Sequence, residues 1–415
     1  MLLVEYKYFI ERRNKLSKKI NDLELMILFS GKAPLKSADE NYSFTPNRNF
    51  FYLTNIDEEE DIYVIYKEND IVHEMIFIHR YNELEAKWIG SKYDEEYVRE
   101  KSGIQEIYYL DQFTSFIESN INKFKTLYLD LERDENLSLY TMGQLYYKEI
   151  KEKYSSLEIK DAYSIIAALR MIKDDLEISK IKKAIEITRL GIEKMMLNTT
   201  YIKYEYELEA YFDFVIKQNG ASDFAFKTIA ASGKNAAVLH YSKNNSLVNK
   251  DDLILFDLGA EYEYYKADIS RTFPISGKFD EYQKTLYNIV LNGQKEVFNH
   301  IKPGITTKQL NEKLINYYAI ELKKIGLIKE DEEVRKYYFH GVSHHLGLDT
   351  HDACIYGEPL VEGNIITVEP GLYIEDKNIG IRIEDDVLIT KDGFINLSSN
   401  IIKTVEDIEK FMEGR

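Results

Sequence analysis

The last third of the chain holds acidic residues placed symmetrically about turn-like segments, and this spacing constrains the fold more than any other feature. Asp257 ends an apolar run, residues 253–256, that is typical of a buried strand. Asp268 follows in a second extended stretch. Positions symmetric about a tight hairpin turn face each other, so a turn between Tyr262 and Glu263 predicts that Asp257 lies opposite Asp268.

A second acidic pair repeats the arrangement. The midpoint between Glu369 and Glu384 falls between Asp376 and Lys377, inside the turn-like segment 375–380. Two hairpins would therefore each direct two carboxylates inward. Four carboxylates without countercharge on one buried face would repel strongly, and divalent cations are the simplest partners that neutralise them.

Histidines are concentrated close to these hairpins. The chain has eight histidines, and His340, His344, His345 and His351 fall within one short glycine-containing segment. An isolated histidine would be interpreted as structural, whereas this cluster favours a functional site. Four carboxylates and one imidazole suit two hard to borderline divalent metals rather than a thiolate zinc site. The predicted ligands are Asp257, Asp268, His344, Glu369 and Glu384.

These motifs resemble those of the pita-bread metallopeptidases, the family of aminopeptidase P, prolidase, methionine aminopeptidase and creatinase. The resemblance spans nearly the whole chain and is strongest over residues 165–410. Segments 228–245 and 340–352 resemble the proline-peptidase branch, and aminopeptidase P most closely. Segments 44–56 and 85–93 resemble parts of the family's N-terminal domain.

The resemblance implies a role for each predicted ligand. Asp257 binds one metal, His344 and Glu369 bind the other, and Asp268 and Glu384 bridge the two. The metals are commonly manganese, with cobalt and zinc as alternatives. A hydroxide shared by the two ions then attacks the scissile carbonyl.

The resemblance also implies residues that contact the substrate. His240, His340, His351 and Arg382 match substrate-contacting and proton-handling positions of the family. Among these, His351 is expected to stabilise the developing oxyanion, and His240 to contact the substrate beside the metals. Glu369 is expected to carry the proton of the water to the leaving nitrogen in addition to binding metal. His345 departs from the family pattern, which has an aromatic residue there.

Periodicity and the resemblance together predict two domains. Residues 1–160 are expected to form a smaller α/β domain of the creatinase and aminopeptidase P type, with strands over 24–31, 61–67, 73–79 and 126–131 and helices over 2–20 and 137–154. Residues 165–415 are expected to form an α+β catalytic domain, a curved antiparallel sheet with helices outside. Its expected helices include one capped by Asp174 with Glu177, one over 203–218, and two over 279–300 and 307–325, the last opened by a Thr306 and Gln309 capping box.

Composition limits the location and partners of the protein. A net charge of −17 argues against nucleic acid and anionic membranes as partners. No apolar stretch is long enough to span a bilayer, and no secretory signal begins the sequence. Cys354 is the only cysteine, so no intrachain disulfide can form. These features predict a cytoplasmic protein, and the resemblance predicts a homodimer. Trp88 either packs in the core of its own domain or, as an alternative to Arg48, reaches toward a substrate pocket, that of the partner subunit included.

Several functions remain compatible with the sequence. The favoured one is an Xaa-Pro aminopeptidase that acts on peptides with proline in the second position. Prolidase, which cleaves only dipeptides, differs by a closed pocket for the free proline carboxylate. A metal-free binding protein on the same scaffold would lack metal ligands, and all five are present here. A creatinase-like activity on a non-peptide substrate is a further alternative.

Overall fold

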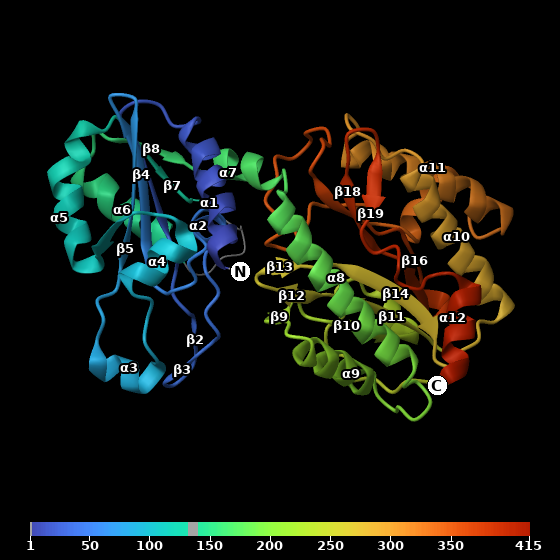
Figure 1. The fold of residues 1–415 in the computed structure, drawn as a ribbon. Helices are drawn as coiled ribbons and strands as arrows, with labels where there is room; N and C mark the ends of the chain where they lie inside the picture. Colours follow the sequence, from blue (N-terminus) through green and yellow to red (C-terminus); the bar gives the residue numbers. More distant parts are fainter. Residues whose placement is uncertain (1, 132–139) are drawn as a thin grey trace. The chain divides into compact units, whose positions relative to one another are not determined.

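The structure is a computed structural model that describes residues 2–131 and 140–415 (Figure 1). It separates into two compact units, Met1–Arg170 and Met171–Arg415. The first three residues of the helix expected over 137–154 lie outside the described residues. None of the helices in the described ranges is long and apolar enough to cross a membrane.

The first unit is built on a six-stranded mixed sheet with the order β6-β5-β4-β1-β7-β8. β1 pairs antiparallel with β4 and parallel with β7, which is the α/β character expected for this half of the chain. The four predicted strands are confirmed as β1, β4, β5 and β7, and β6 and β8 were not predicted. The strands are β1 (Glu24–Phe29), β4 (Ile62–Glu68), β5 (Ile71–Ile78), β6 (Glu106–Tyr109), β7 (Thr126–Leu129) and β8 (Glu158–Asp161), with a separate hairpin of β2 (Leu35–Ser37) and β3 (Glu40–Asn41).

Apolar side chains on one face of this sheet, among them Leu25, Ile27, Val64, Phe77 and Leu127, form a buried core with α5 and α6. The helices of the unit are α1 (Leu2–Ser17), α2 (Arg48–Thr54), α3 (Glu83–Ile89), α4 (Glu95–Ser102), α5 (Leu110–Asn120), α6 (Met142–Lys153) and α7 (Tyr163–Arg170). Trp88 on α3 is 83% exposed, so it does not serve the core of this chain.

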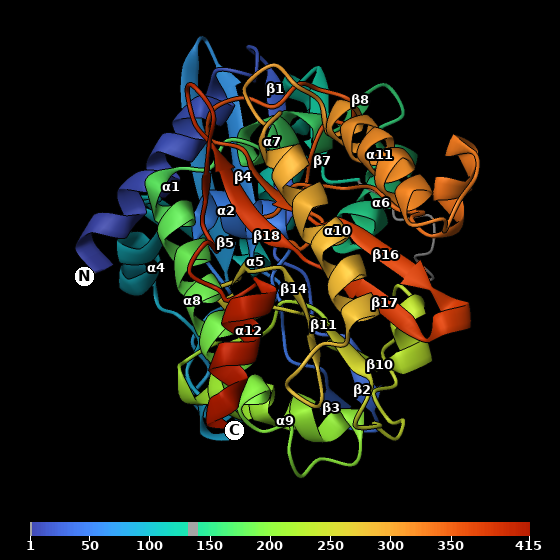
Figure 2. The same ribbon diagram turned by 90° about the vertical axis from the view of Figure 1, so that its right-hand side faces the viewer.

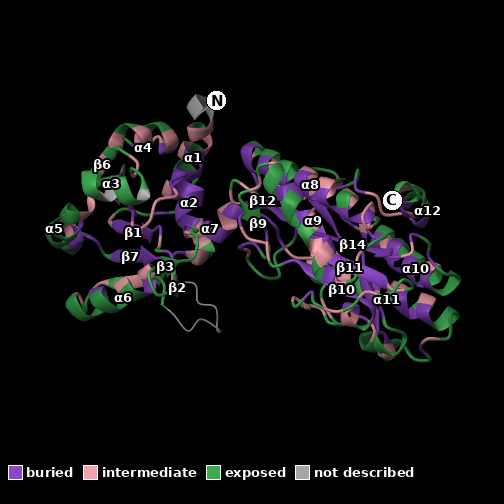
Figure 3. Ribbon diagram, turned by 90° about the horizontal axis from the view of Figure 1, so that it is seen from below, coloured by how far each residue is buried: buried purple, intermediate pink, exposed green. Residues whose placement is uncertain are grey.

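The second unit is α+β, as expected, and every strand pair described in it is antiparallel. Figure 3 shows its central strands buried, while the helices expose one face. The strands are β9 (Asp223–Phe224), β10 (Ile229–Ser232), β11 (Leu253–Leu258), β12 (Ala260–Tyr262), β13 (Tyr265–Lys266), β14 (Ile269–Pro274), β15 (Ile365–Val368), β16 (Gly371–Ile374), β17 (Ile379–Arg382), β18 (Asp385–Ile389) and β19 (Phe394–Asn396).

Helices α8, α10, α11 and α12 lie along the strands of this unit (Figure 2). α8 and α9 contact each other and the β9 to β13 region, and α10 contacts α11, β16 and β17. Asp174 caps α8 and Thr306 caps α11, both through the predicted capping boxes. The helices are α8 (Asp175–Met196), α9 (Glu205–Gln218), α10 (Glu281–Phe298), α11 (Thr307–Lys324) and α12 (Val405–Phe411).

The first ligand hairpin has a register two residues away from the predicted one. Asp257 pairs with Ser270, not with Asp268, because the turn is centred on Glu263 and Tyr264, which both have positive φ. Side chains alternate with a period of two, so this shift keeps both aspartates on the same face. Gly259 allows the strands to approach closely, since a Cβ there would lie 1.8 Å from the carbonyl oxygen of Ala267.

The second hairpin has the predicted register. β16 pairs with β17, with Gly371 opposite Arg382, and the same register continues where Val368 of β15 lies opposite Asp385 of β18. A 3₁₀ turn over Glu375–Lys377 joins β16 to β17. Glu369 and Glu384, which flank this hairpin, therefore occupy corresponding positions on its two sides.

Candidate active site

One cavity of about 850 Å³ lies in the second unit, over the inner ends of the two hairpins. Both polar and apolar side chains line it. All nine residues predicted as ligands or substrate contacts are among the lining residues: His240, Asp257, Asp268, His340, His344, His351, Glu369, Arg382 and Glu384. The structure thus brings together residues from β11, the histidine-rich loop and the second hairpin.

The predicted ligands lie within reach of one another. His344 Nε2 is 3.4 Å from Asp268 Oδ2 and 3.5 Å from Glu369 Oε1. One donor atom from each of Asp268, His344 and Glu384 lies within 4.8 Å of the others, which is compatible with a shared metal ion. His344 Nδ1 lies 3.0 Å from the carbonyl oxygen of His345, so a proton there leaves Nε2 free to bind metal.

Ionisation of the buried carboxylates of Asp268, Glu369 and Glu384 is disfavoured. Burial raises the pKa values of Asp268 and Glu384 well above their usual range, and the charges of neighbouring carboxylates raise them further. Burial likewise raises the pKa of Glu369 to about 7, although His344 and Arg382 act against it. This mutual repulsion is what a bound cation would relieve.

Asp257 provides an independent indication of a cation site. Its Oδ2 accepts a hydrogen bond from Arg382 Nη2 at 2.7 Å, whereas its buried Oδ1 has no hydrogen-bond partner among the described residues. A buried carboxylate oxygen without a partner is costly in the absence of an ion. The donor set therefore fits divalent metal on the chemistry of its oxygen and imidazole atoms.

A chain of hydrogen bonds leads from Asp257 to the histidine loop. Arg382 also donates through Nη1 to Tyr373 Oη at 2.9 Å, and Tyr373 Oη lies 2.9 Å from His340 Nε2. His340 Nδ1 is 2.7 Å from the carbonyl oxygen of Gly341, which indicates a proton on Nδ1 and an acceptor at Nε2. Burial, with the Arg382 charge, lowers the pKa of His340 to about 3, so this histidine is neutral.

The remaining histidines divide between cavity and core. The ring of His351 lies 4.3 Å from that of His344, and burial lowers its pKa to about 4. His240 is an exposed residue on the cavity wall. His345 is buried, forms a bridge with Ile366, and is not among the described residues that line the cavity. Its departure from the family pattern therefore changes packing behind the site.

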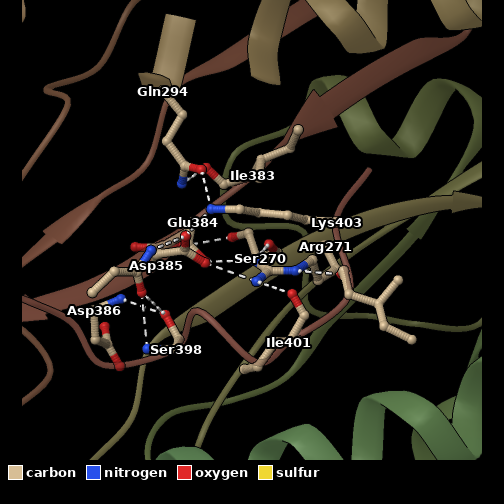
Figure 4. Close-up of polar contacts among 12 residues, drawn as sticks. Ser270, Arg271, Gln294, Ile383, Glu384, Asp385, Asp386, Ser398, Ile401 and Lys403 are labelled. Atoms are coloured by element: carbon tan, nitrogen blue, oxygen red, sulfur yellow. Dashed lines mark hydrogen bonds and ion pairs between the residues drawn. The ribbon is translucent and has the colours of Figure 1, made fainter. Parts of the chain in front are cut away.

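Several supporting residues were not predicted from the sequence. Arg271 is fully buried and donates to the carbonyl oxygens of Ser270 and Glu384 and to the carboxylate of Asp385, as Figure 4 shows. The charges of Arg271 and Lys403 hold the pKa of Asp385 below its usual value although burial acts in the opposite direction. The sequence signal that could have identified these residues was their charge and their position beside the predicted ligands.

Glu205 was also missed. Its buried carboxylate accepts hydrogen bonds from Ser232, Asn235, Tyr241 and Ser246. Glu205 thus stabilises both ends of segment 232–246, which carries His240 on the cavity wall. An acidic residue in the first turn of a helix ordinarily indicates only a favourable interaction with the helix dipole, so no sequence pattern distinguishes Glu205.

Comparison with known proteins gives the same fold and identifies the family. Residues 179–391 match the model of metallopeptidase family M24, and residues 9–128 match that of the aminopeptidase P N-terminal domain. The solved structure of a candidate aminopeptidase P from Bacillus anthracis is 48% identical with a TM-score of 0.96 and covers 98% of both chains. Zinc-substituted aminopeptidase P of Escherichia coli in complex with product is 28% identical with a TM-score of 0.91 over 99% of both chains.

Relatives of known activity align over almost the whole chain. The Xaa-Pro aminopeptidase of Haemophilus influenzae is 32% identical over 97% of this chain and 96% of its own length. Xaa-Pro aminopeptidase 3 of Dictyostelium discoideum is 33% identical over 99% of this chain and 84% of its own length. The fold and the donor cluster define a metal-dependent peptidase whose cavity binds divalent metal. More narrowly, the chain belongs to metallopeptidase family M24 and carries the N-terminal domain of aminopeptidase P.

Proposed function

We propose that this protein is an Xaa-Pro aminopeptidase, which removes the first residue of peptides that have proline in the second position. One observation carries the proposal: the five predicted metal ligands line one cavity in a chain that aligns from end to end with Xaa-Pro aminopeptidases. The ligands are Asp257, Asp268, His344, Glu369 and Glu384.

The proposed metal centre holds two manganese ions. Asp257 would serve one ion, His344 and Glu369 would serve the other, and Asp268 and Glu384 would contribute to both. The proximity of His344 Nε2 to Asp268 and Glu369 supports this assignment. When bound, such ions lower the pKa of a water molecule and polarise a carbonyl group.

The protein side chains then bind the substrate and move protons. Glu369 accepts the proton of the attacking water and delivers it to the leaving nitrogen. His351 donates to the oxyanion that develops at the scissile carbonyl, and His240 contacts the substrate beside it. The proline nitrogen has no N–H, so recognition depends on the shape of the ring. His340 and Arg382 lie on the leaving-group side, where their hydrogen-bonded chain with Tyr373 holds both side chains in place.

Residues 1–160 and 165–415 are proposed as the N-terminal and catalytic domains of a cytoplasmic homodimer. Leu84 and Trp88 lie four residues apart on α3, Tyr81 lies just before this helix, and each of the three is more than two-thirds exposed. We propose these exposed apolar side chains as part of the dimer contact. In the proposed dimer, Trp88 or Arg48 contributes to the rim of a substrate pocket, either that of its own subunit or that of the partner subunit.

A substrate panel with Mn²⁺ tests the proposed activity. The peptide Gly-Pro-Ala should be cleaved before proline, and Gly-Ala-Ala should lose at least tenfold in kcat/KM, about 1.4 kcal/mol. Cleavage of Gly-Pro without cleavage of Gly-Pro-Ala would identify a prolidase. A preference for Met-Ala-Ser or for creatine would contradict the proposal.

A further inference from the structure

Gln294 is a polar side chain on the buried face of α10. It has no exposed surface, and the same face of the helix buries Val290, Leu291 and Val297. An amide buried among apolar residues is stable only when its donors and acceptor are hydrogen-bonded. The partners of this amide therefore explain its presence in a core position.

The Gln294 amide contacts the backbone immediately before each of two proposed metal ligands. Nε2 donates to the carbonyl oxygen of Val368 at 3.0 Å and to that of Ile383 at 3.2 Å. Glu369 and Glu384 are the next residues in the chain. One nitrogen atom thus links the two chain segments from which these glutamates project.

The other end of the amide belongs to a buried charged cluster that holds the same region (Figure 4). Gln294 Oε1 accepts from Lys403 Nζ at 2.8 Å, and Lys403 forms an ion pair with Asp385. Asp385 accepts from Arg271 Nη2 at 2.7 Å, and Arg271 Nη1 donates to the Glu384 carbonyl oxygen at 2.6 Å. Backbone or side-chain atoms of three successive residues, 383–385, are therefore fixed by one connected set of contacts.

We propose that Gln294 is a positioning residue that fixes the separation of Glu369 and Glu384 and thereby sets the affinity for the second divalent ion. The inference rests on the ligand set given under the proposed function. Two carboxylates that serve a pair of ions must keep their positions within about 0.5 Å. Hydrogen bonds that orient metal ligands typically change metal affinity by about 10–100-fold.

Two substitutions separate the functions of the amide. Gln294→Met preserves approximate volume but removes both the donors and the acceptor. Gln294→Glu keeps an acceptor for Lys403, replaces the donor to the two backbone carbonyls by an acceptor oxygen, and adds a negative charge. The matched control is Gln283→Met on the same helix, where Gln283 caps α10 with Asp280 and donates to a carbonyl remote from the ligands.

The experiment titrates Mn²⁺ into the metal-free full chain by calorimetry, with thermal melting and electron paramagnetic resonance of the loaded protein. Both Gln294 variants should bind the second ion at least tenfold more weakly than the unmodified chain does. The signal from coupling between two manganese ions should change in both. Gln283→Met should lower the melting temperature while leaving both affinities and the coupled signal unchanged.

Each contrary result has one meaning. Unchanged second-ion affinity and coupling in a folded Gln294→Glu variant would overturn the positioning role, whether or not Gln294→Met folds. An equal loss in Gln283→Met would also overturn it, because general destabilisation would then suffice. Binding of only one ion by the unmodified chain would instead refute the ligand set on which the inference rests.

Discussion

Glu205→Gln tests whether a buried carboxylate holds the segment over the cavity. Glu205 Oε1 accepts from Ser232 N, Ser232 Oγ and Asn235 Nδ2 at 2.8, 3.0 and 2.9 Å, and Oε2 accepts from Tyr241 Oη and Ser246 N at 2.7 and 2.9 Å. Glutamine replaces one of these oxygens by a group that only donates. In either orientation of the amide, at least two donors therefore lose their acceptor.

The expected loss of stability follows from this geometry. Hydrogen bonds to a charged group contribute at least about 1.5 kcal/mol each, so the free energy of unfolding of the catalytic unit should fall by about 3 kcal/mol. For a unit of this size, the melting temperature should fall by roughly 6–12 °C. Glu207→Gln is the matched control, because Glu207 lies in the same helical turn and accepts a single backbone hydrogen bond, from Lys203.

Activity gives a second measurement for the same substitution. Because the segment carries His240, Glu205→Gln should reduce kcat/KM about tenfold or more while metal content stays unchanged, since no proposed ligand lies in the segment. If the effect acts through His240, Glu205→Gln should add little to the loss caused by His240→Ala. A melting temperature within about 2 °C of that of the unmodified chain, or fully additive losses in the double variant, would refute the reasoning.

Three further variants probe other parts of the molecule. His351→Ala should retain two metal ions and the fold while kcat falls by roughly 10²–10³; loss of an ion would make His351 a ligand, and near-native turnover would make it structural. Asp352→Asn should lower the free energy of unfolding by about 3–5 kcal/mol in denaturant titrations, because it removes one charge of a pair with Lys173 in which both side chains are 1% exposed; a change below 1 kcal/mol would contradict this. Leu84→Ser with Trp88→Ser should convert the proposed dimer to a monomer in light scattering; an unchanged mass would exclude this face as the contact.

Local patterns were sufficient to predict the second hairpin. Glu369 and Glu384 flank a segment whose turn residues lie at its centre, and the observed pairing of Gly371 with Arg382 has that same centre. The capping boxes at Asp174 and Thr306 were predictable for a similar reason, because each depends on contacts within four residues.

The first hairpin was harder to predict. Its turn residues, Glu263 and Tyr264, adopt positive φ without the Asn-Gly or Asp-Gly signature that would mark a primed turn. The centre was therefore predicted one position too early, and the partner of Asp257 was displaced by two. The periodicity of a strand preserved the face, which is why both aspartates still line the cavity.

The support behind the site depends on contacts between distant parts of the chain. Arg271 reaches Asp385, and Gln294 reaches Ile383, across more than eighty residues. A single sequence contains no local pattern for such pairs, and a glutamine in an apolar helical stripe indicates only that some partner must exist. Packing of α10 against the second hairpin supplies that partner.

The number of manganese ions bound per chain tests the central claim most directly. Metal-free protein titrated with Mn²⁺ should bind two ions in one site, and Asp268→Ala should weaken both, because Asp268 is proposed to bridge them and lies 3.4 Å from His344. Saturation at a single ion whose affinity is unaffected by Asp268→Ala would contradict the proposed centre.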